Sequence, residues 1–504
     1  MENSIYHQVA SHISKGILEN NFSLPDEDGS QSPLKFAPGA LDGMCLYHMR
    51  RGELDAEAEK QMAEALEEAA KGNFPKADAL FHEWTKDHRT ISYIDDFQNY
   101  VRAHTQELDP GNVHRVALAM VLHSEHIECV KVGLALFELF TEPNERLKVI
   151  IRDLGLYDEF TVFSVWNMQR WENGNQEIFS LAKKTHSWGR IHAVECLVPE
   201  TEEIRHWLLT EGTVNDVVNA YSSLTCWQKA GAEEILFGQP APDEFEGLTT
   251  LIEGLLDEGP VPGISRLENA EAVLMRFLAV APNYSLTADD YDTILSVREW
   301  AENKDSDLTS VIEACDRILH SAACTASIEE AVKEGRALRL AEALDIPYLD
   351  QMLACMERDF DGNYPNVRYL LADPAYVEPA LKLYLEELPL AEMKGDPIDD
   401  PCLGAEYKDF DKLQYLIQEL DDKPLTGCEF IKAALESPVS RNRYRALAVL
   451  QAWVEAKGTA LSELNPELNE AVSLLEWREI VEGNLKMIEA LLAGETRFSA
   501  DSGE

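Results

Sequence analysis

Residues 186–195, HSWGRIHAVE, place two imidazoles, an indole, a guanidinium and a carboxylate within ten positions of the chain. His192 and Glu195 lie three positions apart, so on a helix they share a face and could relay a proton or hold a metal ion together with a third group. On a helical wheel both point away from the apolar arc, whereas Arg190 lies within it. His192 and Glu195 are therefore the candidate catalytic residues, with an ordinary contact on a solvated helix face as the alternative.

Other stretches with metal-ligand residue types lack the spacing that a metal site requires. His123, His126 and Cys129 span more than one helical turn, with Cys129 rotated away from the two histidines, so the three cannot face one ion. The acidic stretch 359–363, DFDGN, is similar to the start of a calcium-binding loop but is not followed by the glycine and the final carboxylate of that loop. We expect no metal site.

Aromatic side chains gather between residues 157 and 227, which hold five of the nine tryptophans. Tryptophan and arginine dominate binding hot spots because each buries a large area with few rotamers to freeze. One interpretation is that these aromatic side chains only fill gaps between irregular helices. The other is a binding surface that consists of Trp166, Arg170, Trp171, Trp188 and Trp207.

The elements that must position these residues are helices. Nearly every segment between turn signals is 10 to 20 residues long, with apolar residues at three- and four-residue steps, and sustained two-residue alternation is missing. The hydrophobic fraction of 45% is ample for a large buried core. The sequence predicts an all-α fold with no significant β-sheet, and clear helical segments are 58–71, 114–124, 127–140, 270–280, 376–388, 442–456 and 469–493.

The regions 180–197 and 432–450 share a layout in which a turn is followed by Arg, two residues, Ala and an aliphatic residue four positions later. Arg190 and Arg443 fall within the apolar arcs of their helices, and Lys131 occupies the corresponding position in a looser match. Such a cation lays its methylene groups along neighbouring side chains and bridges to a carboxylate or carbonyl of the adjacent unit. Arg190 and Arg443 are therefore expected to be structural.

This layout resembles that of HEAT and armadillo-type repeats, whose second helices often begin with Arg or Lys ahead of an Ala-aliphatic run. The resemblance implies a curved, irregular α-solenoid of HEAT-like helix pairs. Residues 186–212 are also similar to a group of bacterial helical proteins, some of which are labelled limonene hydroxylase. That label implies an oxygenase. The chain lacks a haem-binding cysteine context, a G-x-G-x-x-G loop after a strand and a two-histidine, one-carboxylate set, so we expect no cofactor.

Stretches rich in Pro, Gly and Asp interrupt the helical sequence and predict its division into segments. The segments are an N-terminal helical segment at 1–110, HEAT-like aromatic-rich repeats at 111–240, a middle helical region at 241–395, C-terminal HEAT-like helices at 396–493 and a disordered tail at 494–504. The candidate catalytic and binding residues fall in the second of these segments.

Charge and cysteine usage limit the classes of partner. The chain has 91 acidic and 44 basic residues, a net charge of −47, which repels phosphate backbones and anionic lipid surfaces. Its nine cysteines form no CxxC pair, its N-terminus shows no signal-peptide pattern, and no window holds the roughly 20 apolar residues of a membrane span. We expect a cytoplasmic protein that binds neither nucleic acid nor membranes.

Together these features favour a non-catalytic scaffold that binds a protein or peptide, neutral or basic by charge complementarity, along a solenoid surface. The alternative is an enzyme of unknown reaction with a pocket among helices near 157–207, in which His192 or Glu195 acts as acid or base and Arg170 orients an anionic group. A third class is the helical-repeat DNA glycosylases, which use tryptophan and carboxylate residues. These enzymes need a basic concave face to bind DNA, and the net charge of −47 argues strongly against this class.

Overall fold

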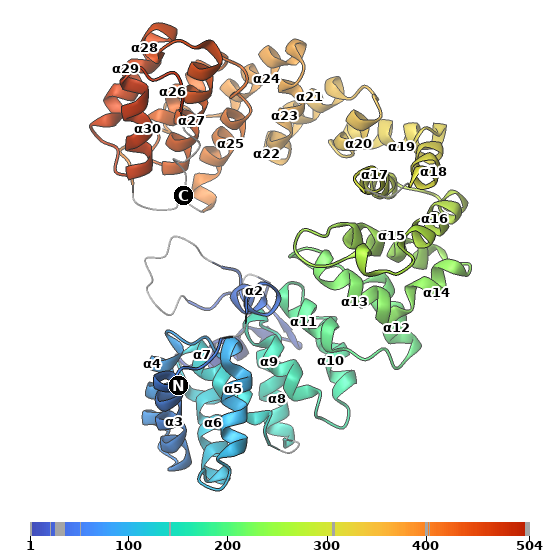
Figure 1. Cartoon of the computed structure of the whole chain (residues 1–504), viewed down its shortest axis with the longest axis vertical. Coiled ribbons are helices and arrows are strands. Elements are labelled where there is room, and N and C mark those ends of the chain that lie inside the picture. The colour runs from blue at the N-terminus through green and yellow to red at the C-terminus, as the bar shows by residue number, and fades with distance from the viewer. Residues whose placement is uncertain are drawn as a thin grey trace. The chain divides into compact units, whose positions relative to one another are not determined.

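The computed structural model describes residues 3–20, 22–25, 36–50, 52–140, 143–304, 308–398, 402 and 404–498 (Figure 1). These residues are mainly helical, and the one sheet among them is the antiparallel pair of β1 (Ile13–Ser14) and β2 (Ile17–Leu18). Lys15 and Gly16 join the two strands and have φ of 54° and 74°, as a two-residue hairpin turn with positive φ at both positions requires. The all-α class predicted from the sequence is confirmed.

Contacts between residues divide the chain into two units. The boundary falls inside the predicted middle region 241–395, and of the predicted tail 494–504, residues 499–504 lie outside the described ranges. The first unit comprises Met1–Leu286 and Thr293–Ile318, and the second comprises Thr287–Asp292 and Leu319–Glu504.

The helices before the boundary are α1 (Ile5–Ser11), α2 (Ala40–His48), α3 (Ala56–Ala70), α4 (Phe74–Thr85), α5 (Thr90–Ala103), α6 (Pro110–His123), α7 (Ile127–Phe137), α8 (Glu145–Gly155), α9 (Asp158–Met168), α10 (Gly174–Ala182), α11 (Trp188–Cys196), α12 (Glu202–Thr210), α13 (Ala220–Ala230), α14 (Ala232–Phe237), α15 (Pro242–Leu256), η1 (Ile264–Arg266), α16 (Ala270–Val280) and η2 (Ala281–Asn283). The boundary region holds α17 (Ala288–Glu302) and α18 (Thr309–Leu319).

The helices of the second unit that follow are α19 (Ala322–Ala331), η3 (Val332–Glu334), α20 (Leu338–Ala343), α21 (Leu349–Arg358), α22 (Phe360–Asn363), η4 (Tyr364–Asn366), α23 (Val367–Leu371), α24 (Pro374–Glu387), η5 (Ala405–Tyr407), α25 (Lys408–Gln418), α26 (Cys428–Leu435), α27 (Ser440–Lys457), α28 (Leu461–Leu464), α29 (Pro466–Glu476) and α30 (Glu482–Leu492). None of the helices in the described ranges has both the length and the apolar content that crossing a membrane requires.

Short polar side chains set where many of these helices begin. Asn465 accepts a hydrogen bond from the backbone N–H of Leu468 at 3.0 Å, and Pro466 follows at the first position of α29. Asn144 caps α8 and Asp109 caps α6 in the same way. Because such caps recur ahead of apolar stripes, the sequence is divided into many short helices.

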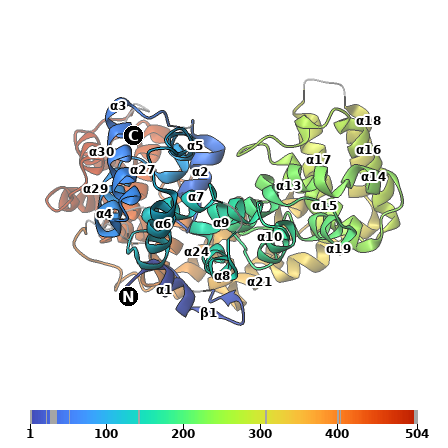
Figure 2. The same ribbon diagram turned by 90° about the horizontal axis from the view of Figure 1, so that it is seen from below.

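Helix α7 is surrounded by other helices of the first unit. Every residue from Cys129 to Phe137 is buried, and α7 packs against α4, α5, α6 and α9. The one charged residue in this run is Lys131. Helix α1 packs against α6 and α8 (Figure 2), and α9 packs against α8 and α11, which carries the predicted catalytic residues.

In the second unit, α27 packs against α25, α26 and α30, and α29 packs against α26 and α30 (Figure 1). The Trp453 side chain of α27 is completely buried and donates from Nε1 to the Leu420 carbonyl, just after α25, at 2.6 Å. A large buried ring whose polar atom is satisfied stabilises this helix contact. The stretch 469–493, predicted as one helical segment, consists of α29 and α30 with a break at 477–481.

Candidate functional site

The predicted catalytic pair lies on α11. His192 is only 2% exposed, contrary to the wheel interpretation, and neither ring nitrogen has a hydrogen-bond partner among the described residues. Its ring stacks with that of Tyr47, with centroids 6.2 Å apart and an interplanar angle of 12°. The wheel interpretation is wrong for His192 because it considers α11 alone, whereas Tyr47 of α2 covers this face. Glu195 is exposed and accepts a hydrogen bond from the Tyr47 hydroxyl at 2.8 Å.

The surroundings of His192 are aromatic rather than reactive. Burial lowers the pKa of His192 to about 4, so the imidazole is neutral at pH 7. The rings of Tyr47 and Trp188 stack around it, and the described residues offer it no hydrogen-bonded acid, base or nucleophile with which to exchange a proton. Burial and the charge of Glu195 raise the pKa of the Tyr47 hydroxyl, which keeps it protonated as a hydrogen-bond donor.

The five residues predicted to form a binding surface are mostly packed inside the first unit. Lys148 and Arg152 lie over the ring of Trp171, at 5.4 and 5.5 Å from its centroid, and the Phe179 ring meets Trp207 edge-on at 5.5 Å. These contacts use ring faces and edges that a partner would need. The buried residues are Trp171, Trp188 and Trp207. Trp166 is half-buried, and Arg170 is exposed.

Arg190 connects the segments that precede α11 and follow α12. It donates from Nε to the Thr185 carbonyl at 2.7 Å and from Nη1 to the Val214 carbonyl at 3.0 Å. Both acceptors belong to the backbone, so the guanidinium satisfies carbonyls at helix ends that would otherwise need water.

Arg443 connects α27 to the break between α29 and α30. Its side chain and that of Glu479 are both 0% exposed, and they form a two-pronged ion pair with distances of 2.7 and 2.9 Å. Burial alone would raise the pKa of Glu479, but hydrogen bonds from Arg443 and from the backbone N–H of Val481 hold it below its usual value. The Arg443 guanidinium also donates to the Ser437 and Pro438 carbonyls, so the pair is fully satisfied.

A group of five charged side chains that the sequence does not predict as a site lies inside the first unit. The Lys131 ammonium is completely buried among three carboxylates, at 2.8 Å from Asp42 Oδ2, 2.9 Å from Glu128 Oε1 and 2.5 Å from Glu159 Oε1. Arg89 precedes α5 and contacts the same carboxylates, most closely Oδ1 of Asp42 at 2.7 Å. These five residues are called the Lys131 cluster below.

The Lys131 cluster holds three acidic and two basic side chains. Burial opposes ionisation of Glu128, but attraction to Lys131 and Arg89 lowers its pKa to about 2. The same cations lower the pKa of Glu159 against the effect of burial. Burial raises the pKa of Asp42 in spite of Lys131, and the neighbouring Glu128 and Glu159 add to the increase. Asp42 is therefore the carboxylate whose charge is least stabilised in the cluster.

The three carboxylates of the cluster have the spacing of a metal site. Oxygens of Asp42, Glu128 and Glu159 lie within 4.8 Å of one another, close enough to share one cation. The Lys131 ammonium takes the position that such a cation would need, so the arrangement is an internal ion-pair centre that joins α2, α7 and α9. The sequence signal was the occurrence of Lys131 at the position equivalent to Arg443.

An apolar group lies exposed where α29 ends and α30 begins. Trp477 is 88% exposed, Leu474 62% and Ile480 53%. The predicted continuous helix over 469–493 conceals this group, because Trp477 and Ile480 lie in the break between the two observed helices. All three lie within seven consecutive residues, 474–480, and exposed large apolar side chains are candidate contact sites for other molecules. These three residues are called the Trp477 corner below.

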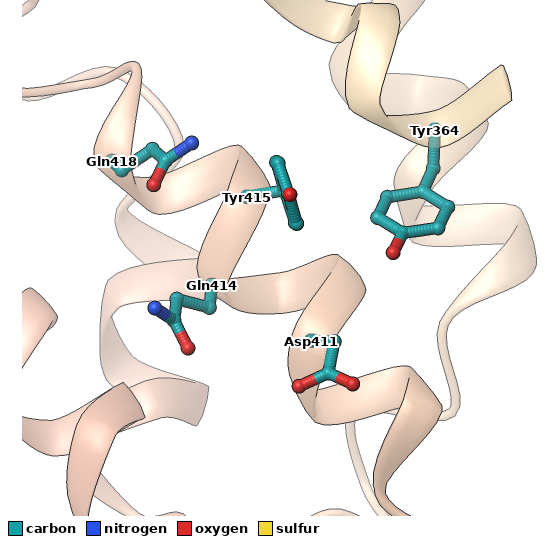
Figure 3. A pocket seen from close by; sticks show the side chains of 5 residues that line it. All are labelled: Tyr364, Asp411, Gln414, Tyr415 and Gln418. Atoms are coloured by element: carbon teal, nitrogen blue, oxygen red, sulfur yellow. The ribbon is translucent and has the colours of Figure 1, made fainter. Parts of the chain in front are cut away.

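A cavity of about 480 Å³ opens on the second unit. Tyr364 of η4 and Tyr415 of α25 meet edge to face there, with ring centroids 5.3 Å apart and an interplanar angle of 78°. No sequence signal distinguishes these residues, because their spacing on α25 is that of any solvated helix face. The cavity is lined by Tyr364, Asp411, Gln414, Tyr415 and Gln418 (Figure 3).

No protein-family model matches the chain, and no curated protein is detectably similar to it.

Proposed function

We propose that the protein is a non-catalytic scaffold that binds a neutral or basic protein through the Trp477 corner. The observation that carries this proposal is the exposure of Trp477, at 88%, in the same seven-residue stretch as two further exposed apolar residues, Leu474 and Ile480. Truncation of a tryptophan at the centre of an interface typically costs about 2 kcal/mol or more of binding free energy. A partner that covers this corner gains that contact.

The charge around the corner favours a basic partner. Residues 461–482 contain six glutamates and one arginine. Three of the glutamates, Glu463, Glu470 and Glu476, are exposed, and the other three are paired with Lys432, Arg443 and Lys486. The arginine, Arg478, donates to the backbone carbonyls of Gly395 and Leu435, so its guanidinium is held against the protein. The apolar corner thus lies in a negative field that attracts cations and accelerates association with a basic surface.

The reactive side chains of both units support the non-catalytic part of the proposal. His192 is enclosed by aromatic rings, Lys131 is enclosed by three carboxylates, and Arg443 is paired with Glu479 inside the second unit. The two cations are satisfied from within the fold, and the imidazole of His192 is buried against aromatic rings without a hydrogen-bond partner. These groups are used for packing and assembly rather than held ready for a substrate.

The test is a quantitative capture experiment with the full chain as bait in an extract of its native cells. We expect a specific protein to be retained by the wild type and by a Leu385→Ala control, which removes a 46%-exposed leucine of α24, but lost with Trp477→Ala. Trp477→Phe should retain part of the binding. The same set of proteins on wild type and Trp477→Ala, with both variants folded by circular dichroism, would refute the proposal.

A further inference from the structure

The cavity on the second unit is lined by five side chains, each of which carries a hydrogen-bonding group. Four of them form one stripe along α25, because their positions are spaced i, i+3, i+4 and i+7; they are Asp411, Gln414, Tyr415 and Gln418. Tyr364 lies across from this stripe (Figure 3). The tyrosine hydroxyls and the glutamine amides both donate and accept, whereas the carboxylate of Asp411 only accepts. A ligand that fills the cavity must therefore supply donors as well as acceptors.

Several hydrogen-bonding positions of the lining are left open by the contacts that its residues make within the fold. Gln418 donates one N–H to Oε1 of Glu419 at 3.3 Å and keeps a second N–H and its carbonyl oxygen. Arg441 contacts Oδ1 of Asp411, so Oδ2 can accept a further hydrogen bond. Burial raises the pKa of Tyr364, so its hydroxyl stays protonated and can donate. The lining can therefore hold a ligand by several hydrogen bonds at once.

The charged side chains that act on the lining, taken with the partners that neutralise them, are equal in number and opposite in sign. The acidic ones are Asp361, Asp409, Asp411 and Glu419, and the basic ones are Arg368, Lys408, Lys412 and Arg441. The charge of the lining itself, on Asp411, is compensated by Arg441. This balanced set offers no net charge to an ionic ligand, so the cavity favours an uncharged one.

Two aromatic rings form adjoining walls of the cavity. The rings of Tyr364 and Tyr415 are nearly perpendicular, and Figure 3 shows one face-on and the other edge-on. The backbone carbonyl of Tyr364 accepts a hydrogen bond from the hydroxyl of the buried Tyr384 at 2.9 Å, which fixes this wall. Tyr415 is 41% exposed, so its ring is accessible to a ligand. The electron-rich face of such a ring packs against C–H groups that carry a small positive charge.

We infer that this cavity binds a hexopyranose unit of a neutral saccharide, a binding activity beyond the proposed scaffold function. A pyranose is uncharged, each of its hydroxyls both donates and accepts, and its ring presents a face of C–H groups. That face lies against the Tyr415 ring. The hydroxyls donate to Asp411 and exchange hydrogen bonds with the amides of Gln414 and Gln418. The volume of about 480 Å³ lies within the usual range of small-molecule pockets, roughly 300–1,000 Å³.

The lining distinguishes a saccharide from other ligands that pack on aromatic walls. A proline-rich peptide packs on tyrosine rings, but its prolines have no N–H to donate, so the acceptors of Asp411 and the two glutamines would lose water without replacement. A guanidinium or ammonium group would find Asp411 already paired with Arg441. A saccharide satisfies the donors, the acceptors and the ring faces together.

The test uses the full chain and three probes, methyl β-D-glucopyranoside, methyl β-D-galactopyranoside and methyl α-D-mannopyranoside. We expect at least one of them to bind with a millimolar Kd by isothermal titration, as is usual for a ligand of this size, and its affinity to stay constant as salt is raised. Saturation-transfer NMR should place the strongest signals on the ring protons of one sugar face, the face that lies on tyrosine.

Two variants of the lining and one matched control locate the site. Tyr415→Leu and Gln414→Leu should each weaken binding of that glycoside several-fold. Tyr444→Leu is the control, because Tyr444 is 41% exposed, as is Tyr415, but belongs to α27. It should bind the glycoside as the wild type does, with all three variants folded by circular dichroism.

Four results would each overturn the inference: no binding of any of the three glycosides at tens of millimolar, equal losses in Tyr415→Leu and Tyr444→Leu, tighter binding of acetyl-Pro-Pro-Pro-amide than of every glycoside, or affinity that falls as salt is raised. These failures are separable from failure of the scaffold proposal. Trp477 does not line the cavity, so Trp477→Ala should bind the glycoside as the wild type does even where it loses a captured protein.

Discussion

Lys131 and Arg443 are both buried cations at equivalent positions of the repeated sequence layout, but they are satisfied in different ways. Arg443 forms one neutral ion pair with Glu479, and its other acceptors are the carbonyls of residues 437 and 438. Lys131 has three acidic partners, and these come from α2, α7 and α9. The first arrangement joins neighbouring helices, whereas the second also fixes a distant segment, α2, onto the unit.

The difference shows how one sequence feature can serve two purposes. A single partner closes a local contact and leaves no charge uncompensated. Three carboxylates around Lys131 and Arg89 leave an excess negative charge. Burial, together with the charges of Glu128 and Glu159, raises the pKa of Asp42, the residue that α2 contributes. The position of α2 therefore depends on Asp42, a carboxylate whose charged form is only weakly stabilised. The predictions that follow separate the two arrangements, from the largest effect to the smallest.

Lys131→Met should cause the largest loss of stability. It removes the ammonium and leaves three buried carboxylates facing Arg89 alone, so we expect the free energy of unfolding to fall by about 5 kcal/mol. Urea unfolding followed by circular dichroism measures the change. Lys60→Met, at an exposed position of α3, is the control and should alter stability by less than about 0.5 kcal/mol. A loss for Lys131→Met as small as that of the control would show that the cluster is not the centre described.

Arg443→Met should cost less, about 3 kcal/mol, because one carboxylate is left behind. Glu479 would keep hydrogen bonds from the backbone N–H groups of Ile480 and Val481 and from the Asn484 amide. Adding Glu479→Gln should recover much of the stability, since the uncompensated charge is then gone. No recovery in the double variant would mean that packing of the guanidinium, rather than charge, sets the cost.

Acid should remove the stability that neutral His192 contributes to the first unit before it removes the stability that Glu479 contributes to the second. The unfolded pKa of histidine is 6.5 and that of His192 in the fold is about 4, so the unfolded chain binds a proton that the folded chain excludes. The contribution of His192 is complete above about pH 6.5 and is lost between about pH 6.5 and 4, by on the order of 3 kcal/mol. Asp158 acts in the opposite direction, because burial raises its pKa to about 7. The Glu479 pKa is lowered, so its contribution is lost only below its unfolded pKa of 4.5.

Amide hydrogen-exchange protection in α11 and α27 between pH 7 and pH 5 tests this order. Between pH 7 and pH 5, protection of α11 in the wild type should fall relative to that in His192→Phe, which keeps the other titrating groups, while α27 stays equally protected in both. The same pH dependence of α11 in the two proteins would show that His192 does not contribute to it.

Gly43→Ala should have the smallest effect, about 2 kcal/mol, and should act on α2 alone. A Cβ at position 43 would lie 2.2 Å from a ring carbon of Trp188, so α2 would have to shift. Hydrogen exchange in α2 should rise and the fluorescence of Trp188 should change. Gly483→Ala in α30 is the control, because a Cβ at that position meets nothing within 4 Å. Equal behaviour of the two variants would show that α2 is not seated on Trp188.

The helical class could be predicted because apolar spacing at three and four residues is a local property. The buried position of Arg443 on its helix followed from the same local pattern. The Lys131 cluster could not be predicted, because Asp42 and Arg89 are remote from it in sequence and their approach depends on tertiary packing. A helical wheel likewise describes one helix at a time, so it could not predict that Tyr47 of another helix covers His192.

The Trp477 corner could not be predicted from the sequence for a related reason. Trp477 follows an apolar stripe and was part of a segment predicted as one helix, yet that helix ends at Glu476. Helix ends are the least certain feature of a periodic pattern. A shift of the end by a few residues changes a core position into an exposed one, and here it produces the surface on which the functional proposal depends.

The most direct test of the scaffold proposal is the affinity of the captured partner, once purified, for the wild-type protein and for Trp477→Ala. The account predicts binding at least tenfold weaker for Trp477→Ala, with unchanged circular dichroism and with the wild-type affinity itself falling as salt is raised. Equal affinities for the two proteins at all salt concentrations would contradict it.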